Sequence, residues 1–207
     1  VERIKNVAQR VAKWHAAGHQ MVVVPSAMSG ETNRLIALAK EIQPQPDARE
    51  LDMIASTGEQ VSVGLLAMAL KSIGVDAVSY AGWQVPVRTD DAYTKARILS
   101  IDDSRVRADL AAGRVVIVTG FQGVDPAGHI TTLGRGGSDT TAVALAAAFG
   151  RARCETYTDV AGVFSADPRE VPEARVVPRL DYRVCSTLAH LGGRVLHARC
   201  VDLAARE

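Results

Sequence analysis

"TLGRGGSDTTA", residues 132–142, places three glycines within four positions and follows them with Ser138, Asp139 and two threonines. The β-branched stretch "HITTL" leads into it, and the alanine-rich stretch "TTAVALAAAFG" continues from it. Glycines between a strand and a helix permit positive φ and let a ligand approach main-chain N–H groups. The sequence therefore predicts a strand, a tight turn and a helix that Ser138 or Asp139 can cap.

The turn has two interpretations, a simple helix entry or a cradle for an anion at the helix N-terminus. Asp139 opposes a bound anion unless cations lie nearby, and Arg135 supplies one cation within the loop. The spacing matches neither the Walker motif, which needs a lysine after its final glycine, nor G-x-G-x-x-G. Taken alone, the loop leaves both interpretations open.

Composition restricts the class of protein. A chain of 207 residues with 47% hydrophobic residues can bury the core of one large domain. The net charge of +1 gives no reason to expect a nucleic-acid or anionic-membrane partner. The longest apolar runs, such as 115–118, are far shorter than the roughly 20 residues that cross a bilayer. No basic and apolar leader precedes Val1, so we expect a cytoplasmic protein without a membrane partner.

The three cysteines are odd in number and show no C-x-x-C spacing. This pattern argues against a disulfide framework or a zinc site, and small buried residues are expected instead. They are Cys154, Cys185 and Cys200.

Helical and strand patterns alternate along the chain, as in a sheet that is covered by helices. Helical spacing covers residues 1–12 and 33–41, and a longer pattern over 51–74 is interrupted near Gly58. The expected strands are "MVVVPSA" (21–27), "DAVSY" (76–80), "GRVVIVTGF" (113–121), "HITTL" (129–133) and "CETYTDV" (154–160). The third of these is apolar on both faces, as an interior strand is. No domain boundary is visible, so one domain is expected over 1–207.

Six stretches occur in a characteristic order. They are "SAMSGETN", "STGEQVS", "GWQVPVRTD", "VTGFQG", "GRGGSDTTA" and "YTDVAGVFSADPR". Together they resemble aspartate kinase, in the amino-acid kinase family, from residue 1 to about 175 and more loosely to 203. The resemblance implies a kinase catalytic core with an α/β fold, in which α-helices sandwich an open, mostly parallel β-sheet.

The implied reaction is phosphoryl transfer from ATP to the β-carboxylate of L-aspartate, which gives 4-phospho-L-aspartate. This is the first step toward lysine, methionine and threonine. A carboxylate is already a nucleophile at neutral pH, so the protein needs fixed N–H donors, cations and Mg²⁺ more than a general base. The resemblance therefore implies ATP and Mg²⁺ as cofactors, no dedicated metal ligands, and a homo-oligomeric full-length parent.

Matching to the family motifs assigns residues to the aspartate site. Ser26 and Thr32 are implied to lie near the substrate, where hydroxyls hold a carboxylate without adding charge. Glu59 is implied to face the substrate ammonium. Arg135 is implied to pair with a substrate carboxylate, with Ser138 beside it. In isolation each residue also has a local interpretation, as a turn hydroxyl, a helix cap or a solvated charge.

The glycine loop is then implied to be the place where aspartate meets the γ-phosphate of ATP. Gly134, Gly136 and Gly137 belong to the cofactor side of this loop. Asp139 matches a catalytic acid that positions cations and does not take a proton. This role removes the electrostatic objection to an acid beside phosphates.

The nucleotide site is implied to continue in "TYTDVAGVFSADPRE" (156–170). Thr158 and Asp159 would follow a strand, at the edge where open α/β sheets bind ligands. Phe164 stands where the family usually has tyrosine, and Arg169 would contact phosphates. Arg194, in "GGRVLH", replaces the family's phosphate-binding lysine, so weakened ATP affinity or turnover is expected.

The family begins with a strand that carries "KFGGTS" and continues into paired ACT regulatory domains, and the 207 residues include neither. This chain alone is therefore expected to phosphorylate aspartate poorly or not at all, while a full-length parent is an aspartate kinase. Two alternatives remain open. One is a noncatalytic nucleotide-binding or assembly module, and the other is a related kinase that acts on glutamate or acetylglutamate.

Overall fold

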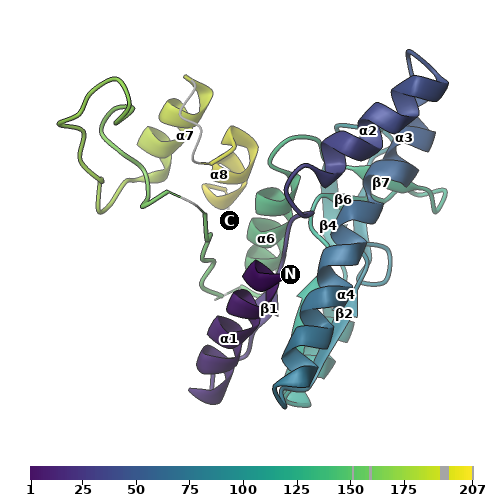
Figure 1. Ribbon diagram of the computed structural model, residues 1–207, viewed down its shortest axis with the longest axis horizontal. Helices are drawn as coiled ribbons and strands as arrows, with labels where there is room; N and C mark the ends of the chain where they lie inside the picture. Colours follow the sequence, from purple (N-terminus) through teal and green to yellow (C-terminus); the bar gives the residue numbers. More distant parts are fainter. Residues whose placement is uncertain (151, 159, 192–195, 207) are drawn as a thin grey trace.

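The computed structural model describes residues 1–150, 152–158, 160–191 and 196–206. Within them, helices pack around two open β-sheets, as Figure 1 shows. The expected α/β fold with a largely parallel sheet is confirmed. The single-domain organisation stays a prediction.

The first sheet has three strands, all parallel. The strand β5 (Val115–Val118) lies between β1 (Val22–Val23) and β2 (Ala77–Tyr80). Its four residues are fully buried, which confirms the interior strand expected from its continuous apolar sequence.

The alternation of side chains along β5 builds a core on each face of this sheet. Val115 and Ile117 face α1 (Glu2–Ala16) and α4 (Thr57–Ser72), which contribute Ala8, Val11, Val63, Leu66, Ala67 and Leu70. Val116 and Val118 pack on the other face against α5 (Ser104–Ala111) and α6 (Gly137–Ala148), through Val106, Leu110 and Leu145. The first sheet is thus covered by helices on both faces.

The second sheet is mixed. Its strand order is β4 (Ile98–Ile101), β3 (Val87–Thr89), β6 (Gln122–Val124), β7 (Ile130–Thr132), with β3 and β6 parallel and the two outer pairs antiparallel. Only β7 was predicted from the sequence. The strand β7 ends at Thr132, so the glycine loop leaves the edge of this sheet and enters α6.

The remaining helices are α2 (Glu31–Ile42), α3 (Ala48–Ala55), α7 (Tyr182–His190) and α8 (Ala198–Ala204). The predicted helix over 33–41 corresponds to α2. The predicted interruption of the long helical pattern lies at Ser56, where α3 ends and α4 begins. In Figure 1, α7 and α8 lie on one side of the molecule, and α8 packs against α6.

The α3–α4 segment, Ala48–Ser72, is long and apolar enough to cross a membrane by length and composition, although no run of apolar residues in the sequence indicated this. Half of its most apolar window is buried inside the fold. Leu66 and Leu70 lie in the core beside the first sheet, so the apolar composition has a packing role here.

Three local predictions were wrong. The described residues 154–158 form no strand and are exposed, because neither of the two sheets in the described part of the chain includes a strand beside them. Neither Ser138 nor Asp139 caps α6, because Gly136 takes the N-cap position with φ 68° and places both side chains inside the first turn. Burial was expected for all three cysteines, but only Cys200 is buried.

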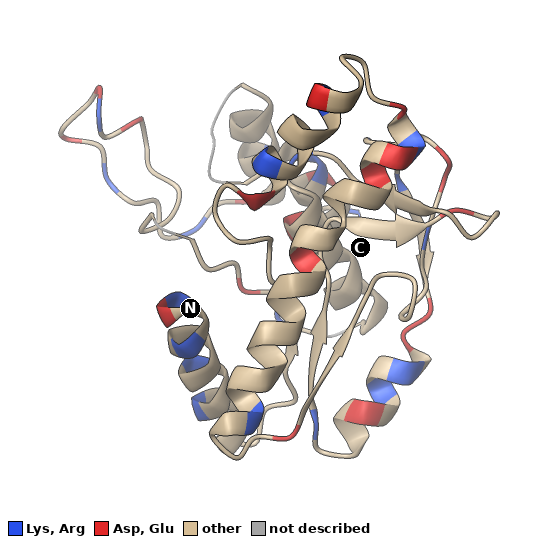
Figure 2. Cartoon of the chain, turned by 45° about the vertical axis from the view of Figure 1, so that its right-hand side comes forward, with Lys and Arg blue, Asp and Glu red and all other residues tan. Residues whose placement is uncertain are grey.

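Charged residues of both signs are interspersed over the helices and loops that the structure describes (Figure 2). The net charge of +1 thus arises because nearly equal numbers of basic and acidic residues, 24 and 23, are mixed along the chain.

Candidate active site

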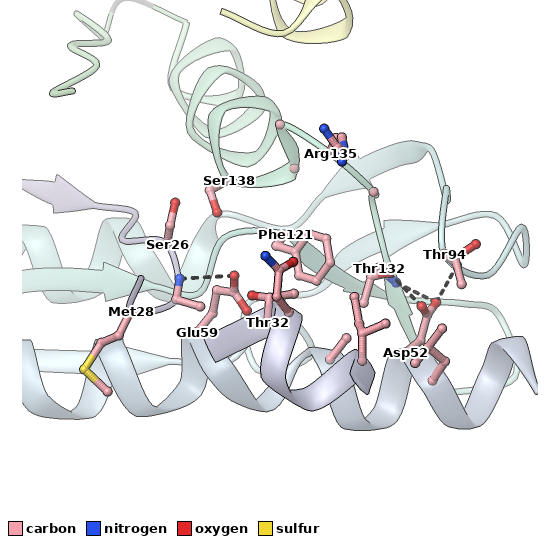
Figure 3. Close-up of a pocket in the computed structure, with 18 of the residues that line it drawn as sticks. Ser26, Met28, Thr32, Asp52, Glu59, Thr94, Phe121, Thr132, Arg135 and Ser138 are labelled. Atoms are coloured by element: carbon pink, nitrogen blue, oxygen red, sulfur yellow. Dashed lines mark hydrogen bonds between the residues drawn. The ribbon is translucent and has the colours of Figure 1, made fainter. Parts of the chain in front are cut away.

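A cavity of about 600 Å³ opens where the loop after β1 meets α2, α3, the start of α4 and the glycine loop. The loop after β1 leaves the carboxyl end of a parallel strand, the edge at which open α/β sheets bind ligands. All residues that the sequence assigned to the aspartate site and the glycine loop line this cavity: Ser26, Thr32, Glu59, Gly134, Arg135, Gly136, Gly137, Ser138 and Asp139. Figure 3 shows several of them around one space.

Glu59 lies in the first turn of α4 and is only 3% exposed. Its Oε1 atom accepts a hydrogen bond from the backbone N–H of Ala27 at 3.2 Å, whereas its buried Oε2 atom has no partner among the described residues. Burial raises the pKa of this carboxyl group to about 7, and the hydrogen bond from Ala27 opposes the rise. A cation in the cavity would satisfy Oε2 and favour the ionised form.

The glycine loop owes its shape to the absence of side chains. Gly134 and Gly136 have φ of 75° and 68°, and the N–H of Gly137 donates to the carbonyl of Gly134 at 3.0 Å. A Cβ atom on Gly136 would lie 2.3 Å from Cβ of His197, and one on Gly137 would lie 2.8 Å from the ring of Phe121. The loop is therefore packed closely on these neighbours and can bring its backbone to the cavity.

Three polar side chains belong to this loop and the first turn of α6. Arg135 is exposed, and no carboxylate among the described residues pairs with it. Ser138 is half-buried and is directed toward Ser26 and Glu59 in Figure 3. Burial raises the pKa of the half-buried Asp139, while nearby His197 acts to lower it.

Sequence analysis missed several residues of the cavity wall. Asp52, on α3, is completely buried and accepts hydrogen bonds from Thr94 and Thr132. Phe121 also lines the cavity, with a φ of 70° that is unusual outside glycine. One signal was available for Asp52, because it shares the helical face of Ala55 and Glu59 in the pattern over 51–74.

The described residues that were predicted to bind the nucleotide do not line one common cavity. Thr158 lines a second cavity of about 310 Å³ with Thr156, Tyr157, Val160, Ala161, Gly162, Val163 and Leu196. Phe164 instead pairs with Val176 through an isolated bridge, and Arg169 forms an ion pair with Asp167 at 2.6 Å. Neither residue lines the first or the second cavity. Asp159 and Arg194 lie outside the described residues.

Across the described ranges, no cluster of three or more histidine, cysteine, aspartate or glutamate side chains has a geometry that could hold a metal ion. Asp139 and Glu59 are carboxylates at the first cavity, and Asp52 lies in its wall.

The profile of the amino acid kinase family matches residues 1–207 of this chain. The aspartokinase of Pseudomonas aeruginosa is 59% identical over 206 residues, which cover 100% of this chain and 50% of that protein. The chain spans about half the length of the curated relatives that it matches.

Two solved structures agree with this match. The aspartate kinase from Synechocystis superposes with a TM-score of 0.83 at 46% identity, over 98% of this chain and 34% of that chain. The aspartokinase III of E. coli, in complex with aspartate and ADP, superposes with a TM-score of 0.85 at 27% identity, over 97% of this chain and 56% of that chain.

Proposed function

The chain belongs to the amino acid kinase family, and from this membership we propose that it forms the kinase domain of an aspartate kinase. The reaction is transfer of the γ-phosphoryl group of ATP to the β-carboxylate of L-aspartate. One observation carries the proposal: the cavity combines the unpartnered, buried Oε2 atom of Glu59 with the cationic Arg135. An amino acid presents an ammonium and a carboxylate, the two groups that these side chains can bind.

In this proposal the substrate ammonium binds Glu59, and its α-carboxylate binds Arg135. The hydroxyl groups of Ser26, Thr32 and Ser138 hold the substrate without adding a charge that competes with the reaction. The site thus fixes the ammonium group and the α-carboxylate of the amino acid and leaves the β-carboxylate to face the glycine loop.

The glycine loop provides the backbone N–H groups of Gly134 and Gly136 at the entry to α6, where the helix dipole favours anions, and Gly137 closes the turn through its own N–H. The N–H groups of the loop can bind a nucleotide phosphate. The half-buried Asp139 can lie beside this phosphate only if cations stand between the two negative groups. ATP with bound Mg²⁺ supplies the transferable phosphoryl group and neutralises its charge. Asp139 orders the cations around it, and no residue has to remove a proton because the acceptor is a carboxylate.

Thr158 is proposed to contact the nucleotide from the second cavity. Asp159, Phe164, Arg169 and Arg194 keep their predicted nucleotide roles as part of the proposal. For Arg169 such a role requires its ion pair with Asp167 to open, so that the guanidinium can turn to the phosphates.

The product of this reaction, 4-phospho-L-aspartate, would enter lysine, methionine and threonine biosynthesis. A cytoplasmic location and a homo-oligomeric assembly complete the proposal. The location keeps the expectation drawn from the sequence, and the assembly is what the resemblance to aspartate kinase implies for the full-length parent.

The test is an ADP-release assay on a full-length protein that carries these 207 residues, with aspartate, glutamate and acetylglutamate as acceptors. We expect aspartate to exceed the longer acceptors in kcat/KM by roughly 100-fold, the scale on which a fitted pocket rejects one methylene group. A preference for glutamate or acetylglutamate would contradict the proposal. ATP binding in calorimetry without release of ADP to any acceptor would favour a noncatalytic module.

A further inference from the structure

Asp52 is a fully buried carboxylate that accepts three hydrogen bonds. Its Oδ2 atom accepts from the backbone N–H of Thr94 at 2.9 Å and of Thr132 at 2.8 Å, and its Oδ1 atom accepts from Oγ1 of Thr132 at 2.6 Å (Figure 3). No lysine or arginine among the described residues forms an ion pair with it. Burial raises its pKa and the three hydrogen bonds oppose the rise, so its ionised form depends on these donors.

Both residues that donate hydrogen bonds to Asp52 adjoin or contact the glycine loop. Thr132 is the last residue of β7, two positions before Gly134. Thr94 has a φ of 67°, and its carbonyl oxygen would lie 2.9 Å from a Cβ atom on Gly134. Thr94 therefore packs directly on the loop, and Asp52 holds this neighbour and the start of the loop with the same oxygen atom.

The opposite wall of the cavity depends on the adjoining helix. Glu59, in the first turn of α4, accepts the hydrogen bond from Ala27 in the loop after β1. Between the two acids, the carbonyl of Ser56 accepts a hydrogen bond from Nε2 of Gln122 at 2.8 Å, which anchors the junction of α3 and α4 to β6. The consecutive helices α3 and α4 thus hold two walls of the cavity. Asp52, on α3, holds the glycine-loop wall, and Glu59, on α4, holds the wall formed by the loop after β1.

We propose that Asp52 is a positioning residue for the amino-acid substrate, because it fixes the glycine loop, and with it Arg135, relative to Glu59. The inference rests on the proposed function for the identity of the substrate. Asp52 acts through Thr94 and Thr132, and the reacting groups are bound by other residues.

The first variant is Asp52→Asn in the full-length protein, which keeps the shape but removes the negative charge and replaces one acceptor oxygen with an NH₂ group. Weakening of these charge-assisted hydrogen bonds should loosen the glycine loop and raise the KM for aspartate about tenfold. The KM for ATP should rise less than the KM for aspartate, because the glycine loop is proposed to hold only the phosphates of the nucleotide, whereas it carries Arg135 for the amino acid.

The matched control is Asp109→Asn. Asp109 is also a buried aspartate on a helix, 8% exposed, and accepts from Tyr80 Oη at 2.6 Å and from Arg114 at 2.9 Å, but it lies outside the cavity lining. This variant should lose stability and leave the KM for aspartate within about twofold. An equal rise of that KM in both variants would reduce Asp52 to a general stabilising residue and overturn the proposal.

A second measurement needs no substrate. Amide hydrogen exchange over residues 132–137 should accelerate about tenfold in Asp52→Asn and stay at the wild-type rate in Asp109→Asn. If this exchange accelerates but the wild-type protein does not use aspartate, the positioning of the loop stands and the proposed function fails. Unchanged exchange over 132–137 would overturn the positioning proposal whatever the kinetics show.

Thr132 supplies the second variant, for the case in which Asp52→Asn does not fold. Thr132→Val removes the hydroxyl donor to Asp52 and keeps the side-chain shape, so exchange and the KM for aspartate should both rise. Thr132→Ser keeps the donor and should raise them less. Equal effects of the valine and serine variants would contradict the role of this hydrogen bond.

Discussion

The N–H of Ala27 donates a hydrogen bond to Oε1 of Glu59 at 3.2 Å and joins the loop after β1 to the first turn of α4. This bond orients the carboxylate so that one oxygen is engaged and the other, Oε2, is buried without a partner among the described residues. An oriented, half-satisfied carboxylate at the wall of a cavity is suited to bind a cation.

The affinity for aspartate should depend on pH through Glu59. Because its pKa in the free protein is about 7, most of the population is protonated at pH 6 and must ionise before it can pair with the substrate ammonium. The dissociation constant for aspartate should therefore be about tenfold larger at pH 6 than at pH 8, in proportion to the ionised fraction. Calorimetric titrations at the two pH values provide the measurement.

Glu59→Gln is the companion variant for this titration. It should bind aspartate more weakly at pH 8 and lose the pH dependence between 6 and 8. The exposed Glu41→Gln should behave like the wild-type protein. A wild-type profile that persists in Glu59→Gln would assign the titration to another group.

The stability of the protein without substrate should also depend on Glu59. Its pKa is about 7 in the folded state, above the ordinary value of 4.5, so the unfolded chain ionises first. The folded state then loses relative stability as the pH rises from about 4.5 to about 7. Denaturant unfolding at pH 5 and pH 8 should show a smaller loss in Glu59→Gln than in the wild-type protein, and equal losses would contradict the burial of this carboxyl group as the cause.

Gly136→Ala should destabilise the fold more than Gly128→Ala. Both glycines have positive φ, 68° and 86°, so each alanine variant carries a backbone strain of roughly 1–2 kcal/mol. Only at position 136 would the new Cβ meet another atom, Cβ of His197 at 2.3 Å, whereas at position 128 nothing lies within 4 Å. Overpacking should add about 1–3 kcal/mol to the cost at position 136. Comparable free energies of unfolding for the two variants would contradict this packing.

Asp139→Asn should lower kcat far more than it changes the KM for aspartate. The variant keeps the shape but removes the charge that is proposed to order cations at the phosphates, a contribution on the scale of roughly 100-fold. Steady-state kinetics measure both parameters, with Asp103→Asn, at the N-cap of α5 and outside the cavity lining, as a control. A rise in the KM for aspartate at unchanged kcat would place Asp139 in substrate binding instead.

Ordered motifs in the sequence predicted a set of residues that the fold gathers at one cavity, and their role in binding aspartate stays a prediction. Ser26, Glu59 and Arg135 are far apart along the chain, yet the loops that contain them line one cavity. The interior strand β5 was predictable for a different reason, because burial on both faces demands a continuous apolar run.

Asp52 was not predicted, because the helical face that it shares with Ala55 and Glu59 places it on one side of the helix but does not show that it accepts buried hydrogen bonds. Only the fold brings Thr94 and Thr132 to it, from 42 and 80 residues away. The expected strand is absent over the described residues 154–158 for the opposite reason: β-branched residues favour a strand only where a neighbouring strand is available.

The most direct test is a crystal structure of a full-length protein that carries these residues, bound to aspartate and a non-hydrolysable ATP analogue. The account predicts that the aspartate ammonium lies within hydrogen-bonding distance of Oε2 of Glu59 and that its α-carboxylate contacts Arg135. The β-carboxylate should then face the terminal phosphate across the glycine loop. Aspartate bound outside this cavity, or bound with its ammonium away from Glu59, would contradict the account.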